Sequence, residues 1–200
     1  MSTVRVKGLK QVARRFDRTE RQTRRAAKLA INDTVRKMRT LGSREIRKQV
    51  ALKASYVKKH LNVQLATERS LFGRVYATRR PVLLSRFGAK QLTRKASGAA
   101  GDPSRSIPAG RKQAGVSVRV KAGGSRKKMR GAFFIRLKRG PYRGEGATGL
   151  AIRTGPGRDA IDVKHGPSVD QVWRDVRDNI QPQADENLAR EMRRQLRRLT

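Results

Sequence analysis

The chain has 200 residues, enough for one domain of ordinary size, and carries 50 Lys and Arg against 15 Asp and Glu, a formal net charge of +35. It contains no cysteine, which excludes disulfides, thiolate catalysis and cysteine-based metal sites. No apolar run approaches the roughly 20 residues of a membrane span, and the first residues lack the apolar stretch of a secretory signal. We therefore expect no membrane partner and synthesis in the cytoplasm.

The apolar interior is small for so charged a chain. Val, Leu, Ile and Phe account for 43 residues, or 21.5%, just above the roughly 20% below which highly charged chains tend to be disordered. We expect an isolated copy to be marginally stable and to gain stability from neighbours that neutralise it. Residues 1–142 have a net charge of +33 and residues 143–200 one of +2. This division predicts a polyanion-facing surface in the first part and protein contacts in the second.

Two helices are predicted near the N-terminus. Apolar residues recur every three or four positions over residues 18–52, which is typical of an amphipathic helix. The pattern is interrupted at Gly42 and Ser43, where we expect a kink or break. A second, short helix is predicted within residues 53–63, with Ser55 as its N-cap. The basic face of the first helix suits a solvated surface, DNA or an acidic subunit.

The middle of the chain has the patterns of β-strands. Alternating or continuous apolar stretches predict strands over residues 71–78, 81–88, 92–96, 116–120, 132–137, 150–153 and 160–164. Glycine, proline and serine predict long loops over residues 97–111 and 139–149, and residues 123–131 have the composition of a basic turn. The strands are close in sequence, so a mainly antiparallel sheet with long basic loops is expected.

A C-terminal helix is predicted to follow residue 168. Ser168 and Gln171 have the spacing of a capping box, and Pro182 is expected to kink or break the helix. Its apolar stripe is a candidate protein interface. The stripe consists of Trp173, Val176, Ile180, Leu188, Met192 and Leu196.

Together these elements predict an α+β fold with N-terminal helices, a central mainly antiparallel β-sheet and a C-terminal helix. We expect one domain over residues 1–200. Within it, residues 1–65 would form a helical part, residues 66–165 a β-rich part, and residues 166–200 the C-terminal helix.

The sequence contains no recognisable catalytic constellation. His60 and His165, the two histidines, do not have the spacing of a metal-binding pair. Residues 1–142 contain six acidic residues, too few and too dispersed for the clustered carboxylates of a metal-dependent nuclease. The glycine-rich segments lack the lysine of a phosphate-binding loop and the dinucleotide fingerprint. We expect no catalytic residue, no metal and no cofactor.

Clustered cations are the positive signal for a binding function. Such clusters contact phosphates without reading sequence, and with 4% aromatic residues a base-stacking platform is not expected. We therefore expect contacts with the backbone of double-stranded DNA rather than with its bases. The candidate residues are Arg79, Arg80, Arg86, Lys90, Arg94 and Lys95 in one group, and Arg126, Lys127, Lys128 and Arg130 in another.

An ordered set of short motifs extends over most of the chain. The motifs are KGLKQ at residues 7–11, AAKLAINDTVRK at 26–37, RPVLL at 80–84, RGAFFIRL at 130–137 and AIDVKHGPSV at 160–169. In this order they resemble the minor tail protein Z family of lambda-like phages, whose members are also described as tail completion proteins.

The resemblance implies a non-enzymatic virion component made in the host cytoplasm and placed at the head-proximal end of the tail. It implies a homo-oligomeric ring, expected to have six copies because tail tubes have sixfold symmetry. The implied partners are the tail terminator, tail tube or neck proteins, together with the DNA end. Two alternatives remain: a stand-alone nucleic-acid-binding protein without sequence specificity, and an enzyme acting on nucleic acid.

Overall fold

The computed structural model describes residues 20–137, 148–157 and 159–198, and it confirms the mixed α+β class. The described residues divide into two compact units. Unit 1 takes its residues from 1–47, 54–80 and 168–200, and unit 2 takes them from 48–53 and 81–167. Folding as one domain stays a prediction. None of the described helices combines the length and apolar character needed to cross a membrane.

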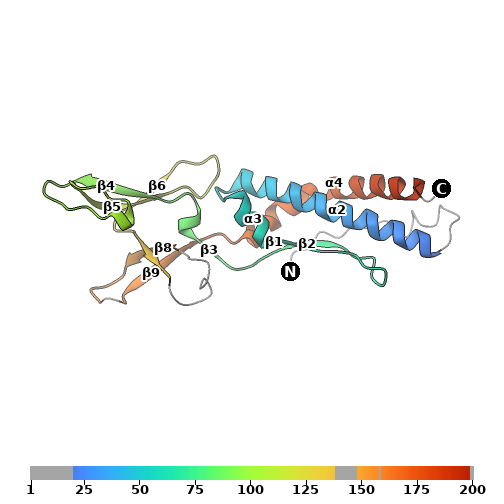
Figure 1. Cartoon of the computed structure of the whole chain (residues 1–200), viewed down its shortest axis with the longest axis horizontal. Helices are drawn as coiled ribbons and strands as arrows, with labels where there is room; N and C mark the ends of the chain where they lie inside the picture. Colours follow the sequence, from blue (N-terminus) through green and yellow to red (C-terminus); the bar gives the residue numbers. More distant parts are fainter. Residues whose placement is uncertain (1–19, 138–147, 158, 199–200) are drawn as a thin grey trace. The chain divides into compact units, whose positions relative to one another are not determined.

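Unit 1 is built on two long helices that lie side by side (Figure 1). The same unit contains a short antiparallel pair of strands, β1 and β2, and β2 contacts α4. The elements are α2 (Glu20–Gln49), α3 (Ala54–His60), β1 (Leu61–Gln64), β2 (Arg74–Ala77) and α4 (Val169–Arg197). The last two residues of α2, Lys48 and Gln49, belong to unit 2.

Trp173 of α4 packs against Gly42 of α2. The Trp173 side chain is completely buried, and a Cβ atom added at Gly42 would lie 2.4 Å from its ring. Because Gly42 has no side chain, the indole of Trp173 fits closely against α2, and α2 continues through this position. The predicted break at Gly42 and Ser43 is therefore wrong, because the interruption of the apolar pattern marks a close packing contact.

The N-terminus of α4 is capped as predicted. The Ser168 Oγ accepts a hydrogen bond from the Gln171 N–H, and the Gln171 side chain accepts one from the Ser168 N–H. Pro182 is exposed inside α4 and does not end the helix, so the predicted break there is wrong. Buried residues on both sides of Pro182, Ile180 and Ala184 among them, hold the helix in the core despite the lost hydrogen bond.

A network of four charged side chains ties α2 to α4. Glu191, whose side chain is 4% exposed, forms ion pairs with Lys37 of α2 and, at 2.6 Å, with Arg194. Arg194 also lies 2.8 Å from Asp33 of α2. The hydrogen bond from Lys37 holds the pKa of Glu191 below its usual range; burial opposes this shift, and the positive charges of Lys37 and Arg194 add to it. Two rare carboxylates thus fix the pairing of the two helices.

Unit 2 contains two antiparallel sheets. One has the strand order β3-β9-β8-β7 and the other the order β4-β5-β6. Phe87 and Val116 are completely buried in this unit. The strands are β3 (Val82–Leu83), β4 (Lys90–Lys95), β5 (Arg111–Val118), β6 (Lys127–Met129), β7 (Phe133–Arg136), β8 (Thr148–Arg153) and β9 (Ile161–Gly166). Two short 3-10 helices cover Leu84–Arg86 and Pro103–Arg105.

Four differences between the observed and the predicted strands stand out. Leu61–Gln64 is strand β1 where the end of a helix was predicted, and β3 gives way to a 3-10 helix after two residues. β5 begins at Arg111, five residues before the predicted start. β6 lies within the predicted basic turn, because backbone pairing with β5 does not require apolar side chains. Most of the predicted loop 139–149 and the motif at residues 7–11 lie outside the described residues.

The buried carboxylate of Glu191 leads to a prediction about pH. Its pKa is lowered in the folded chain, so its contribution to stability is full above the unfolded value of about 4.3 and is lost as the pH falls through the folded value. Glu191→Gln should lower the free energy of unfolding at pH 7 by about 1–3 kcal/mol. It should also reduce the loss of stability between pH 5 and pH 3, roughly the window of an acidic pKa.

The measurement is urea unfolding followed by the fluorescence of Trp173, the only tryptophan, at several pH values. Glu186→Gln is the matched control, because Glu186 is exposed on the same helix and has no ion pair among the described residues. A Glu191→Gln variant with the stability and acid sensitivity of the wild type would show that the network does not hold α2 to α4.

Candidate nucleic-acid interface

The three-stranded sheet β4-β5-β6 has one face rich in cations. Residues directly opposite each other in an antiparallel pair project on the same side. The register pairs Ser117 of β5 with Lys90 of β4 and with Lys128 of β6, and it pairs Arg94 with Lys112. Lys90 and Arg94 are four residues apart on β4, so they share this face. Four exposed cations, Lys90, Arg94, Lys112 and Lys128, therefore lie on what we call the cationic face.

The opposite face of the sheet is directed toward the interior of unit 2. Val116 and Val118 are buried on this side, and the Gln113 side chain donates a hydrogen bond of 2.9 Å to the Ala132 carbonyl. A bulge between Leu92 and Thr93 shifts the register by one residue, and Gly115 accommodates it with φ of 106°. The shift keeps Lys112 on the cationic face together with Lys90 and Lys128, so the bulge is part of what gathers the cations.

Carboxylates are nearly absent around this face. Residues 86–130 contain 13 Lys and Arg and one acidic residue, Asp102. Asp102 forms an ion pair of 3.4 Å with Arg105. Arg94 and Lys112 are directly opposite each other, an arrangement that destabilises a sheet because like charges repel. Strands in a sheet are separated by about 4.8 Å, so the face presents a dense array of positive charge that suits a polyanion.

Arg126 has a structural role in this sheet. Its guanidinium donates hydrogen bonds to the Gly88 carbonyl at 2.6 Å, the Ser117 carbonyl at 2.9 Å and the Ser117 Oγ at 3.2 Å. These bonds attach the turn before β6 to β5 and to Gly88, two residues before β4, and they cover Ser117, which is 5% exposed. The guanidinium is engaged with the protein, so Arg126 positions the cationic face.

The other candidate cations are distributed over several surfaces. Arg79 and Arg80 belong to unit 1, and Arg79 Nε lies 3.9 Å from the buried carboxylate of Asp170. Arg86 is half-buried in a 3-10 helix of unit 2. The register places Lys95 and Lys127 on the face opposite to the cationic one, and Arg130 is exposed directly after β6. Of the ten candidates, the sheet brings together Lys90, Arg94, Lys128 and the positioning residue Arg126.

Sequence reasoning missed Lys112. The preceding loop was predicted to extend to residue 111 and the strand to begin at residue 116, so Lys112 was assigned to neither. No alternation signalled it, because the bulge places Lys112 on the face opposite to Val116. Arg111 was assigned to the preceding loop, and it donates a hydrogen bond of 2.7 Å to the Thr93 Oγ1.

The apolar stripe of α4 forms core within unit 1. All six residues named as a candidate protein interface are buried, with exposed fractions from 0% at Trp173 to 6% at Leu188. A protein interface at these residues stays a prediction, and it would require α4 to separate from its neighbours. The exposed surface of α4 is instead lined by charged residues.

The described residues do not assemble a metal site. Within the parts of the chain that the structure describes, no three His, Asp or Glu side chains lie close enough to hold a metal ion. His60 packs against Tyr56, with 4.3 Å between the ring centroids, and Asp162 forms an ion pair with Lys164 at 2.5 Å. The charged groups that the described structure gathers on one surface are cations, which can bind an anionic partner.

The hydrogen bonds of Arg126 predict separate effects for neighbouring cations. Arg126→Ala should lower the free energy of unfolding by about 1–3 kcal/mol, because it leaves buried acceptors of Ser117 without their donor. Arg126→Lys should restore little of it, since an ammonium does not reproduce the planar fork. Lys128→Ala, an exposed cation two residues away, is the matched control and should change stability by less than about 0.5 kcal/mol. Chemical denaturation measures all three, and equal stability of Arg126→Ala and Lys128→Ala would remove the positioning role.

Comparison with known proteins gives the identity of the chain at the level of the family. No curated protein and no solved structure matches it significantly. A family model described as prophage minor tail protein Z (GPZ) matches residues 6–200, nearly the whole length. The match covers both units and confirms the resemblance drawn from the short motifs. The chain belongs to the prophage minor tail protein Z family.

Proposed function

We propose that this chain, whose family supports a structural role in a phage tail, acts without catalysis as a subunit of a ring, with six copies, at the head-proximal end of the tail. There it would complete the tail, join it to the neck and contact the backbone of the DNA. Its partners would be other copies, the double-stranded DNA, and the tail terminator, tail tube or neck proteins.

The cationic face of the β4-β5-β6 sheet carries the proposal of DNA contact. Four exposed Lys and Arg side chains share one face, and the surrounding residues 86–130 contain a single acidic residue. A duplex presents one negative charge per about 1.7 Å of its length, so a face of uniform sign matches it without base-specific contacts. The two-residue spacing along a strand, about 6.6 Å, allows several cations of one face to meet the same backbone.

The alternative, a stand-alone nucleic-acid-binding protein, uses the same cationic face. It does not account for the family match over residues 6–200 or for the six acidic residues gathered on α4. A tail subunit needs both a polyanion-binding surface and surfaces for other proteins. The tail function is therefore favoured by the distribution of charge as well as by the family.

The location is tested on purified phage particles. We expect quantitative mass spectrometry to find about six copies per tail, the number set by sixfold symmetry of a closed ring. We also expect a gold-labelled affinity tag on the chain to appear at the end of the tail nearest the head. Absence of the chain from particles, or a label at the distal end, would contradict the proposal.

DNA contact is tested by the salt dependence of binding to a random-sequence duplex. Replacing Lys90, Arg94, Lys112 and Lys128 with Gln should reduce the slope of log K against log salt by roughly 0.9 for each lost phosphate contact. A matched control replaces four exposed cations outside the sheet with Gln: Arg25, Arg44, Lys53 and Lys58. An equal change of slope in both variants would mean that the charge of the whole chain, and not this face, attracts DNA.

A further inference from the structure

One row of exposed residues along α4 is divided into an acidic half and a basic half. Steps of three or four residues, which follow one side of a helix, connect Asp175, Asp178, Pro182, Glu186, Arg190, Arg193 and Arg197. All seven residues are exposed. We call this row the α4 stripe. Its first half carries three carboxylates and its second half three guanidiniums, so the near-neutral charge of the C-terminal region conceals a strong separation of sign.

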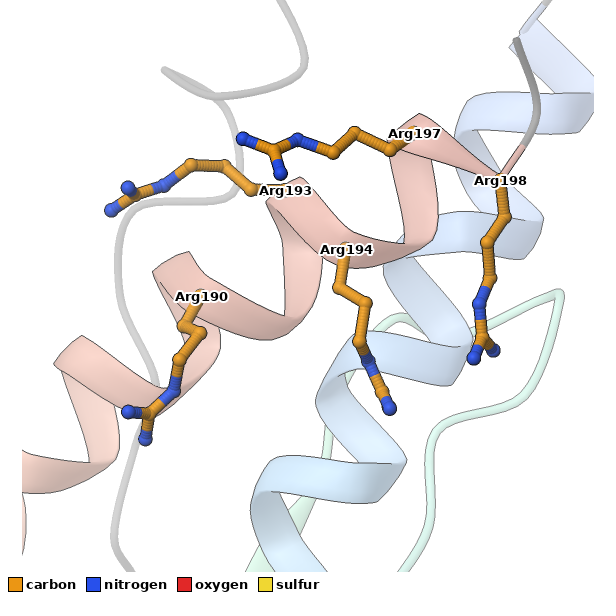
Figure 2. A pocket seen from close by; sticks show the side chains of 5 residues that line it. All are labelled: Arg190, Arg193, Arg194, Arg197 and Arg198. Atoms are coloured by element: carbon orange, nitrogen blue, oxygen red, sulfur yellow. The ribbon is translucent and has the colours of Figure 1, made fainter.

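The basic half borders a pocket that calls for an anion. The pocket has a volume of about 390 Å³ and is lined by Arg190, Arg193, Arg194, Arg197 and Arg198. In Figure 2, Arg194 extends toward α2, where it meets Asp33, whereas Arg193 and Arg197 extend away from α2. Cations in the last turn of a helix are stabilised by its dipole, but Arg190 and Arg193 lie before that turn. Among the described residues, Arg193 and Arg198 are exposed and have no ion pair, so this end of α4 favours binding of an acidic group.

The acidic half supplies carboxylates that are not used within the described chain. Asp175 and Glu186 have no ion pair with any described residue, although the chain has 35 more cations than anions. Asp178 is paired with Arg177 at 3.1 Å, but its side chain is 79% exposed, so this pair contributes little. In so basic a chain, exposed carboxylates left free of intramolecular pairs suggest a use in contacts with another molecule.

Most carboxylates of the stripe are too far from its guanidiniums to pair with them within one copy. Asp178 and Arg193 are 15 residues apart on one continuous helix, a separation of about 22 Å at the helical rise of 1.5 Å per residue. Glu186 and Arg190 are closer, yet Arg190 donates its hydrogen bond to Asn187. A second copy of the chain, in contrast, offers both a carboxylate half and an arginine half, each complementary to the opposite half of the first.

We propose that the α4 stripe is a contact between copies of this chain, in which the arginine pocket of one copy receives the carboxylates of Asp175, Asp178 and Glu186 of another. Guanidinium and carboxylate groups pair through two parallel hydrogen bonds, which gives the contact direction as well as attraction. The inference rests on the proposed function only for the number of copies. In a ring, each copy gives its arginine half to one neighbour and receives the other neighbour on its carboxylate half.

Charge reversal tests this contact. The first variant is Arg193→Glu with Arg197→Glu, and the second is Asp175→Lys with Asp178→Lys; Glu and Lys are both good helix formers at exposed positions. Each variant alone should self-associate at least roughly tenfold more weakly than the wild type, because like charges meet at the contact. A one-to-one mixture of the two should restore association, since the reversed arginine half then meets the reversed carboxylate half. Arg25→Glu with Arg44→Glu on α2 is the matched control for the change in net charge.

The readout is the mass of the full chain by sedimentation, at ionic strengths from about 50 mM, where surface charges are little screened, upward. A wild-type chain that stays a single copy throughout, or variants that associate like the control, would overturn the proposal. Unchanged mass with weakened duplex binding in the first variant would also overturn it and assign the pocket to phosphate. A species of two copies would support the contact while contradicting the ring, whereas absence from virions would contradict the tail function and leave the contact standing.

Discussion

Repulsion among positive charges is the constraint on which the rest of this structure depends. With 35 more cations than anions, the chain cannot match each Lys or Arg with a carboxylate. The buried carboxylates are therefore placed where two cations can share each of them. Glu191 serves Lys37 and Arg194 between the two long helices, and Asp170 serves Arg174 at 2.8 Å and Arg79 at 3.9 Å. Loss of one such carboxylate would remove an ion-pair partner from two cations at once, so each acidic residue affects more of the fold than one in a balanced protein.

Backbone carbonyl groups take the place of the missing carboxylates elsewhere. Arg39 of α2 donates to the Leu61 carbonyl at 2.8 Å and to the Lys58 carbonyl at 2.6 Å, which holds α3 and β1 against the helix. Arg126 does the same within the sheet of unit 2. The cations of this chain are thus of two kinds. Some use their planar donors to join elements, and others, such as Lys90, Arg94, Lys112 and Lys128, lie on an outward surface where another molecule can neutralise them.

The sequence predicted the features that depend on local rules and missed those that depend on packing or pairing. The capping box at Ser168 is a local pattern, and it formed as expected. The pattern around Gly42 predicted a break in the helix, whereas Gly42 makes room for Trp173, a residue 131 positions away in the sequence. Lys112 joined the cationic face through a bulge and a register that the sequence does not display. The sequence therefore predicts that cations are clustered, but the strand register is needed to show which of them share one face.

The sign pattern of a surface indicates the kind of partner that can neutralise it. The cationic face of unit 2 has a single sign, and a partner of uniform opposite charge, such as a nucleic-acid backbone, matches it in many registers. The α4 stripe has both signs in separate halves, and a uniform polyanion would be attracted by one half and repelled by the other. Copies of the chain satisfy both halves, because the arginine half of each copy can meet the carboxylate half of the next in one register. The two patterns therefore suit the two contacts proposed for this chain, one with DNA in many registers and one with its neighbours in a single register.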